Sequence, residues 1–273
     1  AIDDGELMLH YQPIVRIDTG QLIGVEGLIR WQMPGATNIG LLYPHEFMPL
    51  VERTGLAAQV GAWVVAEACR QASAWQNMYP DHRQLFVAVN IGAHQLASSG
   101  VAASVRTAIE EATPAGQHPV QPWQLILDIT EDALHYNRNA SWAALRELKS
   151  LGVKIGLDDF GTGVSSLLYL RQINLDLVRI DKVFIDGIVH NAEDRAIVKH
   201  VAALAHELEL IVIAEGVESE EQVPILETLG VDLAQGFHFG RPETAAQIAE
   251  RIRPDDVEPD QPWDPANVYE FGT

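Results

Sequence analysis

The sequence contains a single cysteine and no long apolar run. Cys69 has no partner for a disulfide within the chain, and one cysteine alone excludes a zinc site built from cysteines. Because it lies among alanines in a helical stretch, we expect a buried structural thiol. No stretch approaches the roughly 18 apolar residues of a membrane-spanning helix, and no basic segment followed by an apolar run marks a secretory signal. We therefore expect no membrane contact for this segment.

Positive charge is also scarce. The 273 residues include 18 Lys and Arg against 38 Asp and Glu, which gives a formal net charge of −20. Such a surface repels polymeric nucleic acid and anionic lipid. An anionic small ligand would need a cation that the sequence does not supply, and a divalent metal ion is the natural candidate. Hydrophobic residues make up 47% of the chain, which is typical of a folded domain and excludes wholesale disorder.

The two ends of the chain differ in character. The chain begins at Ala1 and its first residues already lead into a strand-like run, so we expect a domain excised from a longer protein. After Pro254 the sequence is rich in proline and aspartate and cannot build a core. We expect a folded domain over residues 1–253 and an acidic, proline-rich tail without chemistry over residues 254–273.

Apolar runs of strand length alternate with longer helical patterns. Eight runs are strand-like: Leu7–Ile17, Leu22–Trp31, Leu85–Ile91, Leu125–Thr130, Val153–Leu157, Leu175–Ile180, Ile211–Ala214 and Leu233–Phe239. Helical patterns cover His45–Thr54, Leu56–Trp75, Val101–Ala112, Ser141–Leu151, Ser165–Arg171, Asp194–Leu208, Glu220–Leu229 and Ala245–Arg251. The first two strands form a hairpin, and each later strand precedes a helix, which is typical of a parallel sheet. We predict an α/β fold, a closed (β/α)8 barrel of the TIM type, with an open doubly wound sheet as the alternative.

Polar residues stand at the ends of these apolar strands. In chain order they are Glu26, Arg30, Asn90, Asp128, Glu131, Asp158, Asp159, Arg179, Asp181, Glu215, Glu218 and Gln235. Polar groups inside apolar strands are costly unless they are paired or bound to metal. In a barrel the carboxyl ends of the strands meet at one face, where barrel enzymes carry their catalytic residues. Each acid taken alone is more often a helix cap or a surface ion-pair partner, but the repeat over successive strands favours a common site.

The charges at this predicted face are unbalanced. Six of the side chains are acidic (Glu26, Asp128, Glu131, Asp158, Asp159 and Glu215) and two are basic (Arg30 and Arg179), which leaves four negative charges. Two divalent cations would neutralise them, and carboxylate and amide oxygens suit Mg²⁺ or Mn²⁺. Two such ions can clamp a phosphodiester and activate a water molecule for in-line attack.

The chain contains, in this order, the motifs YQPIV, VEGLIRW, FMPLVE, VNIG, DITED, DDFGTGVSSL, VRID, AEGVES and QGFHFGRP. Over residues 5–252 the sequence with these motifs resembles the EAL domain, the cyclic di-GMP phosphodiesterase domain of bacterial signalling. The resemblance implies a modified TIM barrel whose first strand is antiparallel to the others. It also implies two Mg²⁺ or Mn²⁺ ions, hydrolysis of cyclic di-GMP to linear pGpG, and a bacterial cytoplasmic location, and it leaves a homodimer open.

The resemblance also assigns roles to residues. The first metal would be held by Glu26, Asn90, Asp128 and Asp158, and the second by Asp158, Asp159 and Glu215. Glu131 would support the loop that begins at Asp159, Gln235 would lie near the attacking water, and Arg179 would lie beside the metal-bound water. The residues expected to contact the ligand are Gln12, Leu28, Arg30 and Asp181.

Three positions depart from the family pattern. The signature triplet is Glu-Gly-Leu in place of Glu-Ala-Leu, Asp128 replaces the usual glutamate, and Arg179 replaces the usual lysine. Aspartate is shorter than glutamate by one C–C bond, about 1.5 Å. Arginine keeps the positive charge of lysine but is planar, bulkier and does not release its proton. These departures leave three hypotheses: a slow phosphodiesterase, a degenerate domain that only binds cyclic di-GMP, and a pure protein-interaction domain.

Overall fold

The computed structural model describes residues 1–252, apart from residue 3 and residues 34–39, 81–84, 114–117 and 162–172. The predicted helix Ser165–Arg171 and the predicted tail over residues 254–273 lie outside these residues.

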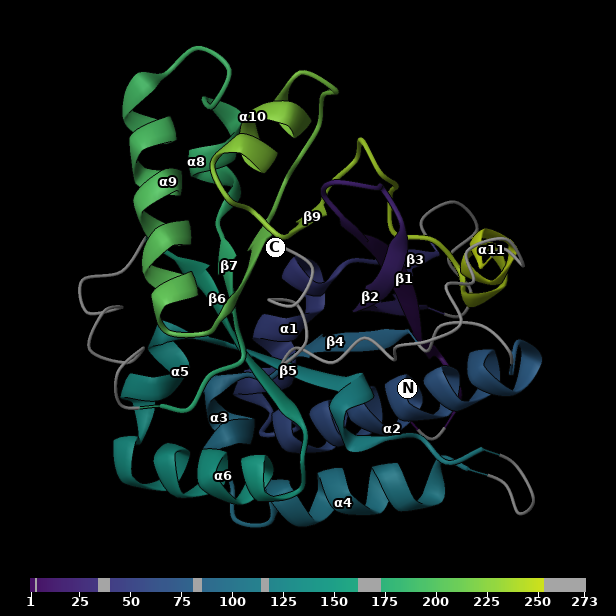
Figure 1. Cartoon of the computed structure of the whole chain (residues 1–273). Helices are drawn as coiled ribbons and strands as arrows, with labels where there is room; N and C mark the ends of the chain where they lie inside the picture. Colours follow the sequence, from purple (N-terminus) through teal and green to yellow (C-terminus); the bar gives the residue numbers. More distant parts are fainter. Residues whose placement is uncertain (3, 34–39, 81–84, 114–117, 162–172, 253–273) are drawn as a thin grey trace.

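Within the described residues, eight strands close into a barrel (Figure 1). They are β1 (Leu7–Arg16), β2 (Leu22–Gln32), β4 (Phe86–Asn90), β5 (Leu125–Thr130), β6 (Lys154–Phe160), β7 (Leu177–Ile180), β8 (Ile211–Ala214) and β9 (Leu233–Gln235). β1 pairs antiparallel with both β2 and β9, whereas β2 and β4 to β9 pair parallel in sequence order. The predicted barrel with an antiparallel first strand is confirmed, and the open sheet is excluded.

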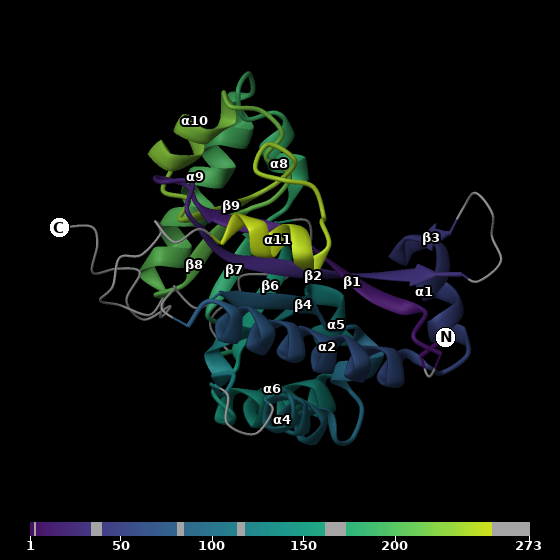
Figure 2. The ribbon, with the colours of Figure 1, turned by 90° about the vertical axis from the view of Figure 1, so that its right-hand side faces the viewer.

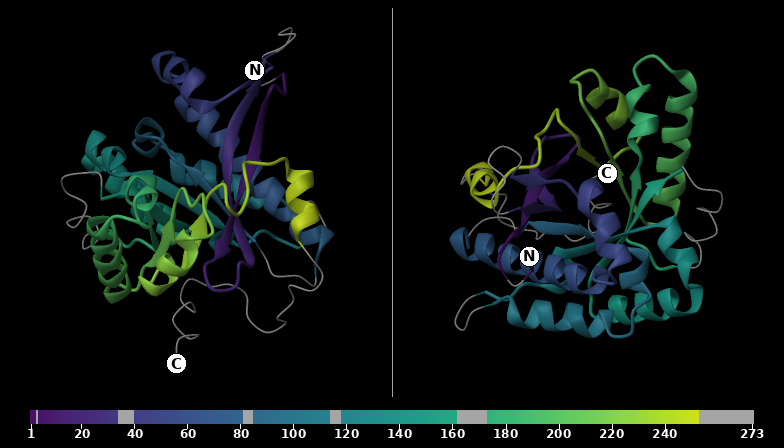
Figure 3. Two further views of the ribbon diagram at one scale, coloured as in Figure 1. Left: turned by 90° about the horizontal axis from the view of Figure 1, so that it is seen from above. Right: turned by 180° about the vertical axis from the view of Figure 1, so that it is seen from behind.

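Helices surround the barrel (Figures 1 and 3). The longer ones are α1 (Pro44–Arg53), α2 (Ala57–Met78), α4 (Val101–Glu111), α6 (Arg138–Ser150), α9 (Ala192–Glu207), α10 (Gln222–Thr228) and α11 (Ala245–Arg251). The sequence patterns missed the short helices α3 (Ala93–Leu96), α5 (Glu131–Tyr136) and α8 (Lys182–Asp186), the short 3-10 helix Pro122–Gln124 and the two-residue strand β3 (Leu41–Leu42). An element of two to six residues completes too few turns to show a 3.6-residue repeat.

Apolar side chains form two layers, one inside the barrel and one between the strands and the helices. The inner layer contains Ile14, Ile23, Phe86, Ala88, Ile126, Leu177, Ile211, Ile213 and Leu233. Because the strands are covered on both faces, their sequences are apolar almost throughout. Cys69 lies in the outer layer as predicted, and burial raises the pKa of its thiol to about 12, which keeps it protonated and unreactive.

The hairpin of β1 and β2 extends beyond the barrel. Only Ile14–Arg16 of β1 pair with β9, and only Gly24–Gly27 of β2 pair with β4, whereas the two strands pair with each other as far as Leu7 and Trp31. Figure 2 shows this arm projecting toward α1, β3 and the N-terminus. The arm carries Leu28 and Arg30 at the same end of the sheet as the carboxyl ends of the parallel strands.

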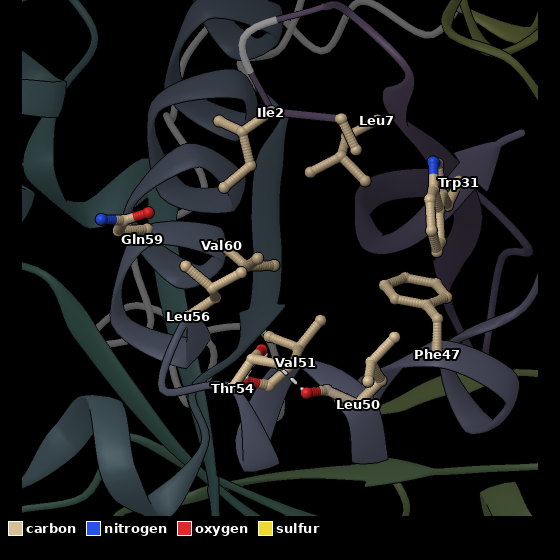
Figure 4. Close-up of a pocket in the computed structure, with 11 residues that line it drawn as sticks. Ile2, Leu7, Trp31, Phe47, Leu50, Val51, Thr54, Leu56, Gln59 and Val60 are labelled. Carbon is tan, nitrogen blue, oxygen red and sulfur yellow. Dashed lines mark hydrogen bonds between the residues drawn. The ribbon is translucent and has the colours of Figure 1, made fainter. Parts of the chain in front are cut away.

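An apolar pocket of about 320 Å³ lies where this arm meets α1 and α2 (Figure 4). Leu7, Trp31 and Phe47 face Leu56 and Val60 across it. The described side chains that line it carry no charge, so the pocket lacks the groups that recognise a phosphate or a metal ion. The polar residues predicted from the strand ends lie elsewhere.

Candidate functional site

The polar side chains form the layer that follows the inner apolar layer toward the carboxyl ends of the strands. Side chains two residues apart in a strand point to the same face. An inner-layer residue is followed two positions later by a polar residue in the pairs Ala88 and Asn90, Ile126 and Asp128, Leu177 and Arg179, Ile213 and Glu215, and Leu233 and Gln235. The strand ends therefore gather these predicted residues in one layer at the mouth of the barrel, as the sequence predicted.

Strand β6 brings two neighbouring carboxylates to this mouth. Leu157 pairs with Val178 and Phe160 with Ile180, so β6 has one residue more than β7 between the two pairs. This bulge interrupts the alternation of side chains. Asp159 adopts a left-handed backbone with φ of 55°, and both Asp158 and Asp159 interact electrostatically with Arg179.

Arg179 lies at the centre of the site and is 1% exposed. Its Nε donates a hydrogen bond of 2.9 Å to Asp128 Oδ2, and its Nη1 donates one of 2.9 Å to Gln235 Oε1. Nη1 also lies 2.8 Å from Glu215 Oε1, and Nη2 lies 3.8 Å from Glu26 Oε2. We call Glu26, Asp128, Arg179, Glu215 and Gln235 the strand-end cluster.

Amide side chains extend the strand-end cluster toward β1. Glu26 Oε1 accepts a hydrogen bond of 2.7 Å from Asn90 Nδ2, and Glu26 Oε2 accepts one of 2.6 Å from Gln235 Nε2. Gln235 Nε2 also donates to Gln12 Oε1 at 3.1 Å, and Gln12 Nε2 donates to the carbonyl of Gly240 at 3.1 Å. Gln12 is the register partner of Glu26, so the antiparallel first strand adds a residue to the mouth.

The site carries more negative charge than its arginine neutralises. Burial raises the pKa of Asp128 to about 7, against the opposing effect of Arg179. Burial also raises the pKa of Asp158 and raises that of Glu215 well above its usual range. Burial and the charge of Asp158 together raise the pKa of Asp159 to about 6. A further cation would relieve this repulsion.

The residues expected to contact a ligand lie around the same mouth. The guanidinium of Arg30 stacks on the ring of Tyr43 at 4.8 Å. Leu28 is half-buried on the projecting arm. Asp181 is the N-cap of α8 and accepts a hydrogen bond of 2.7 Å from the amide of Val183, so it has a structural role whether or not it contacts a ligand. The contacts of these residues with a ligand remain predictions.

Glu131 begins α5, directly after its N-cap Thr130. Its Oε1 lies 3.8 Å from His135 Nε2, one turn further along the helix. The loop that it is expected to support continues into residues 162–172, which lie outside the described part of the chain. Its supporting role therefore stays a prediction.

Two glycines at the site were not selected from the sequence. A Cβ on Gly156 would collide with Oδ1 of Asp128, and a Cβ on Gly236 would collide with the backbone of Val217. Val217 donates a backbone hydrogen bond of 3.0 Å to Gln235, which ties the segment after β8 to β9. A glycine inside an apolar strand, as in the sequence KIGLDDF, is the signal that could have identified Gly156.

We expect Gly156→Ala to lower the free energy of unfolding by about 1–3 kcal/mol, because the added methyl group overpacks the barrel between Asp128 and Leu177. Urea denaturation would measure this loss. Gly92→Ala is the control, since a Cβ at that position would meet no atom within 4 Å. An equal loss in both variants would contradict the assigned collision.

The sequence of the chain identifies its family. Residues 1–242 match the family model of the EAL domain. The chain therefore belongs to the EAL family, and the resemblance that its motifs suggested is confirmed.

Curated relatives carry related descriptions. The chain is 43% identical over 248 residues to the bifunctional diguanylate cyclase/cyclic di-GMP phosphodiesterase MucR of Pseudomonas aeruginosa, covering 91% of this chain and 35% of MucR. It is 39% identical over 253 residues to the cyclic di-GMP phosphodiesterase NbdA of the same organism, covering 93% of this chain and 31% of NbdA. The chain thus spans about a third of the length of these relatives.

Solved structures share the fold. The PaMucR phosphodiesterase in complex with c-di-GMP superposes with a TM-score of 0.81 at 42% identity, covering 91% of this chain and 96% of that one. The EAL enzyme Bd1971, bound to cAMP and cyclic di-GMP, gives a TM-score of 0.83 at 28% identity, covering 92% of this chain and 66% of that one. Over the described residues of our chain, we find no helix with the length and apolar character of a membrane span.

EAL phosphodiesterases generally depend on a divalent metal ion, which requires oxygen ligands at the site. Among the described residues, no three carboxylate, imidazole or thiolate groups stand together as ligands for a metal ion. Mg²⁺, however, is often held by one or two carboxylates together with water and substrate phosphates. The adjacent carboxylates of Asp158 and Asp159 supply such hard oxygen donors. These residues therefore fit a divalent ion whose remaining ligands are water or a phosphate.

Proposed function

We propose that this domain binds cyclic di-GMP and hydrolyses it to linear pGpG in the presence of Mg²⁺ or Mn²⁺. The observation that carries the proposal is the convergence of the strand-end cluster with Asp158 and Asp159 at the mouth of an EAL barrel. The names of the relatives MucR and NbdA support the same activity.

The residues of the chain would divide the work of hydrolysis. Water attacks phosphorus, and one ester bond of the ring breaks to leave a phosphate and a hydroxyl group. A divalent ion held by Asp158 and Asp159 would polarise the phosphate and favour deprotonation of water. Gln235, whose amide is fixed by Arg179 and Glu26, would orient the attacking water. Arg179 contributes a fixed positive charge beneath the reacting phosphate, where negative charge develops.

A domain that binds cyclic di-GMP without cleaving it is the second candidate. It is favoured by the burial of Arg179, because this guanidinium is held by three hydrogen-bonding or ion-pairing partners and has little freedom to assist a reaction. The intact acid pair of β6 favours the enzyme, since a receptor has no chemical need for it.

Mass-resolved product analysis separates the candidates. The purified domain is incubated with cyclic di-GMP and Mn²⁺ or Mg²⁺, and binding is titrated in parallel with Ca²⁺. We expect pGpG to accumulate. Binding in Ca²⁺ without any product in Mn²⁺ would establish the receptor, and the absence of both binding and product would favour a pure protein-interaction domain.

The wider setting of the domain is part of this proposal. We place it in a longer bacterial signalling protein that acts in the cytoplasm, with residues 1–253 as the catalytic unit and residues 254–273 as a tail without chemistry. The partner is cyclic di-GMP and not polymeric nucleic acid, because the net charge of −20 repels a polyanion. The homodimer that the resemblance leaves open stays a prediction.

A further inference from the structure

Arg179 contacts carboxylates that the family pattern would divide between two metal ions. Asp128 and Glu26 belong to the expected ligands of the first ion, and Glu215 belongs to those of the second. In the structure, all three lie within 3.8 Å of the guanidinium nitrogen atoms. The buried side chain of Arg179 thus pairs with carboxylates from the expected ligand sets of both metal ions.

Resting on the proposed function, we propose that the guanidinium of Arg179 replaces one of the two divalent cations, so that the domain binds a single ion at Asp158 and Asp159. The cation that compensates Asp128 and Glu26 is then part of the polypeptide.

Two departures from the family pattern match each other in length. Asp128 is shorter than the usual glutamate by one C–C bond, about 1.5 Å, and Arg179 reaches further than the usual lysine. The longer base meets the shorter acid in a hydrogen bond of 2.9 Å. The aspartate alone would leave a gap to a metal ion, and the arginine alone would crowd a glutamate. Together the two residues form a buried ion pair through Nε and Oδ2.

The energetics favour the internal cation over a metal at this position. Arg179 and Asp128 are each 1% exposed. A metal ion at Asp128 Oδ2 would compete with this buried pair, and breaking a buried pair leaves an uncompensated charge, which is strongly destabilising. Oδ1 has no hydrogen-bond partner among the described residues, but it is fully buried and lies against Gly156. The guanidinium also stays protonated under all ordinary conditions. Asp158, by contrast, accepts a hydrogen bond from the backbone amide of Asp159 at Oδ1, and the described part of the chain shows no hydrogen bond to its Oδ2, where we place the metal.

Counting bound Mn²⁺ tests this inference. The wild-type domain and Arg179→Lys are equilibrated with saturating Mn²⁺ without nucleotide, and the bound metal is measured by equilibrium dialysis and electron paramagnetic resonance. We expect one Mn²⁺ per chain in the wild type and two in Arg179→Lys, because the shorter point charge frees the oxygens of Asp128 and Glu26. Two ions in the wild type, or one in the folded lysine variant, would overturn the proposal.

A matched pair of isosteric variants makes the test independent of the lysine variant. Asp158→Asn should lose the single Mn²⁺, whereas Asp128→Asn should keep it with unchanged stoichiometry. Loss of the ion in Asp128→Asn, or its retention in Asp158→Asn, would contradict the assignment. Since metal is counted without cyclic di-GMP, a failure of this inference is distinct from a failure of the proposed function, which the product analysis detects.

Discussion

Replacing Arg179 with methionine is expected to lower the free energy of unfolding by about 3–5 kcal/mol at neutral pH, because it leaves buried charges without their partner. The carboxylate of Asp128 loses its only hydrogen bond among the described residues, and Glu215 loses its ion pair at 2.8 Å. Methionine fills much of the volume of arginine, so the loss is mainly electrostatic. Urea denaturation without added metal would measure it, with Arg106→Met on the exposed face of α4 as the control.

The cost of Arg179→Met should shrink as the pH falls. Burial raises the pKa of Asp128 and Glu215 in the folded state even with the arginine present, and its removal raises both further. The folded variant therefore binds protons that the unfolded chain releases, so its stability increases as the pH falls toward the unfolded values of these acids. A destabilisation that is equal at pH 5 and pH 8, or one no larger than in the Arg106 control, would contradict this account.

Glu26→Gln is expected to lower kcat for cyclic di-GMP by at least about 100-fold with little change in KM. Glu26 accepts hydrogen bonds from both Asn90 and Gln235, whereas one nitrogen of a glutamine would face these donors as a donor itself. Gln235 would then lose the orientation that positions water. Glutamine keeps the volume of glutamate, and its neutral side chain relieves the repulsion of Glu26 with Asp128, Asp158 and Glu215, which offsets the lost hydrogen bond. Stability should therefore change little.

The contrast between rate and stability makes this result diagnostic. A residue that only supports the fold would lower stability and activity together. Glu207→Gln, near the exposed end of α9, is the matched control and should leave both quantities unchanged. Steady-state kinetics and urea denaturation on the same samples provide the comparison, and full turnover by Glu26→Gln would remove Glu26 from the site.

Much of the barrel could be predicted from the sequence, because strands buried on both faces are continuous apolar runs. The bounds of Leu125–Thr130 and Ile211–Ala214 agree with β5 and β8 residue for residue. The last strand was predicted to Phe239 but ends at Gln235, since Gly236 lies against the backbone of Val217 and the chain leaves the sheet there. Of the aromatic residues that follow, Phe239 packs against the core, whereas Phe237 is exposed.

The site was predictable in its members but not in its connections. Spacing by two residues from the inner layer places Asn90, Arg179 and Gln235 at one mouth, and a sequence reveals that spacing. The sequence does not reveal which carboxylates pair with Arg179, because these ion pairs depend on distances across the barrel. The strand predicted over Val153–Leu157 also ends too early, because the polar residues after Leu157 are typical of the end of a strand. In the structure β6 continues through the bulge to Phe160.

The bulge of β6 also sets stability against activity at one residue. Asp159 holds a left-handed conformation with φ of 55°, which strains a residue with a side chain by about 1 kcal/mol or more. Glycine would adopt the same backbone without strain and would also relieve the repulsion from Asp158. Asp159→Gly would therefore raise the stability of the protein and remove one carboxylate from the site. The aspartate at this bend thus lowers thermal stability and, in return, places a second carboxylate beside Asp158.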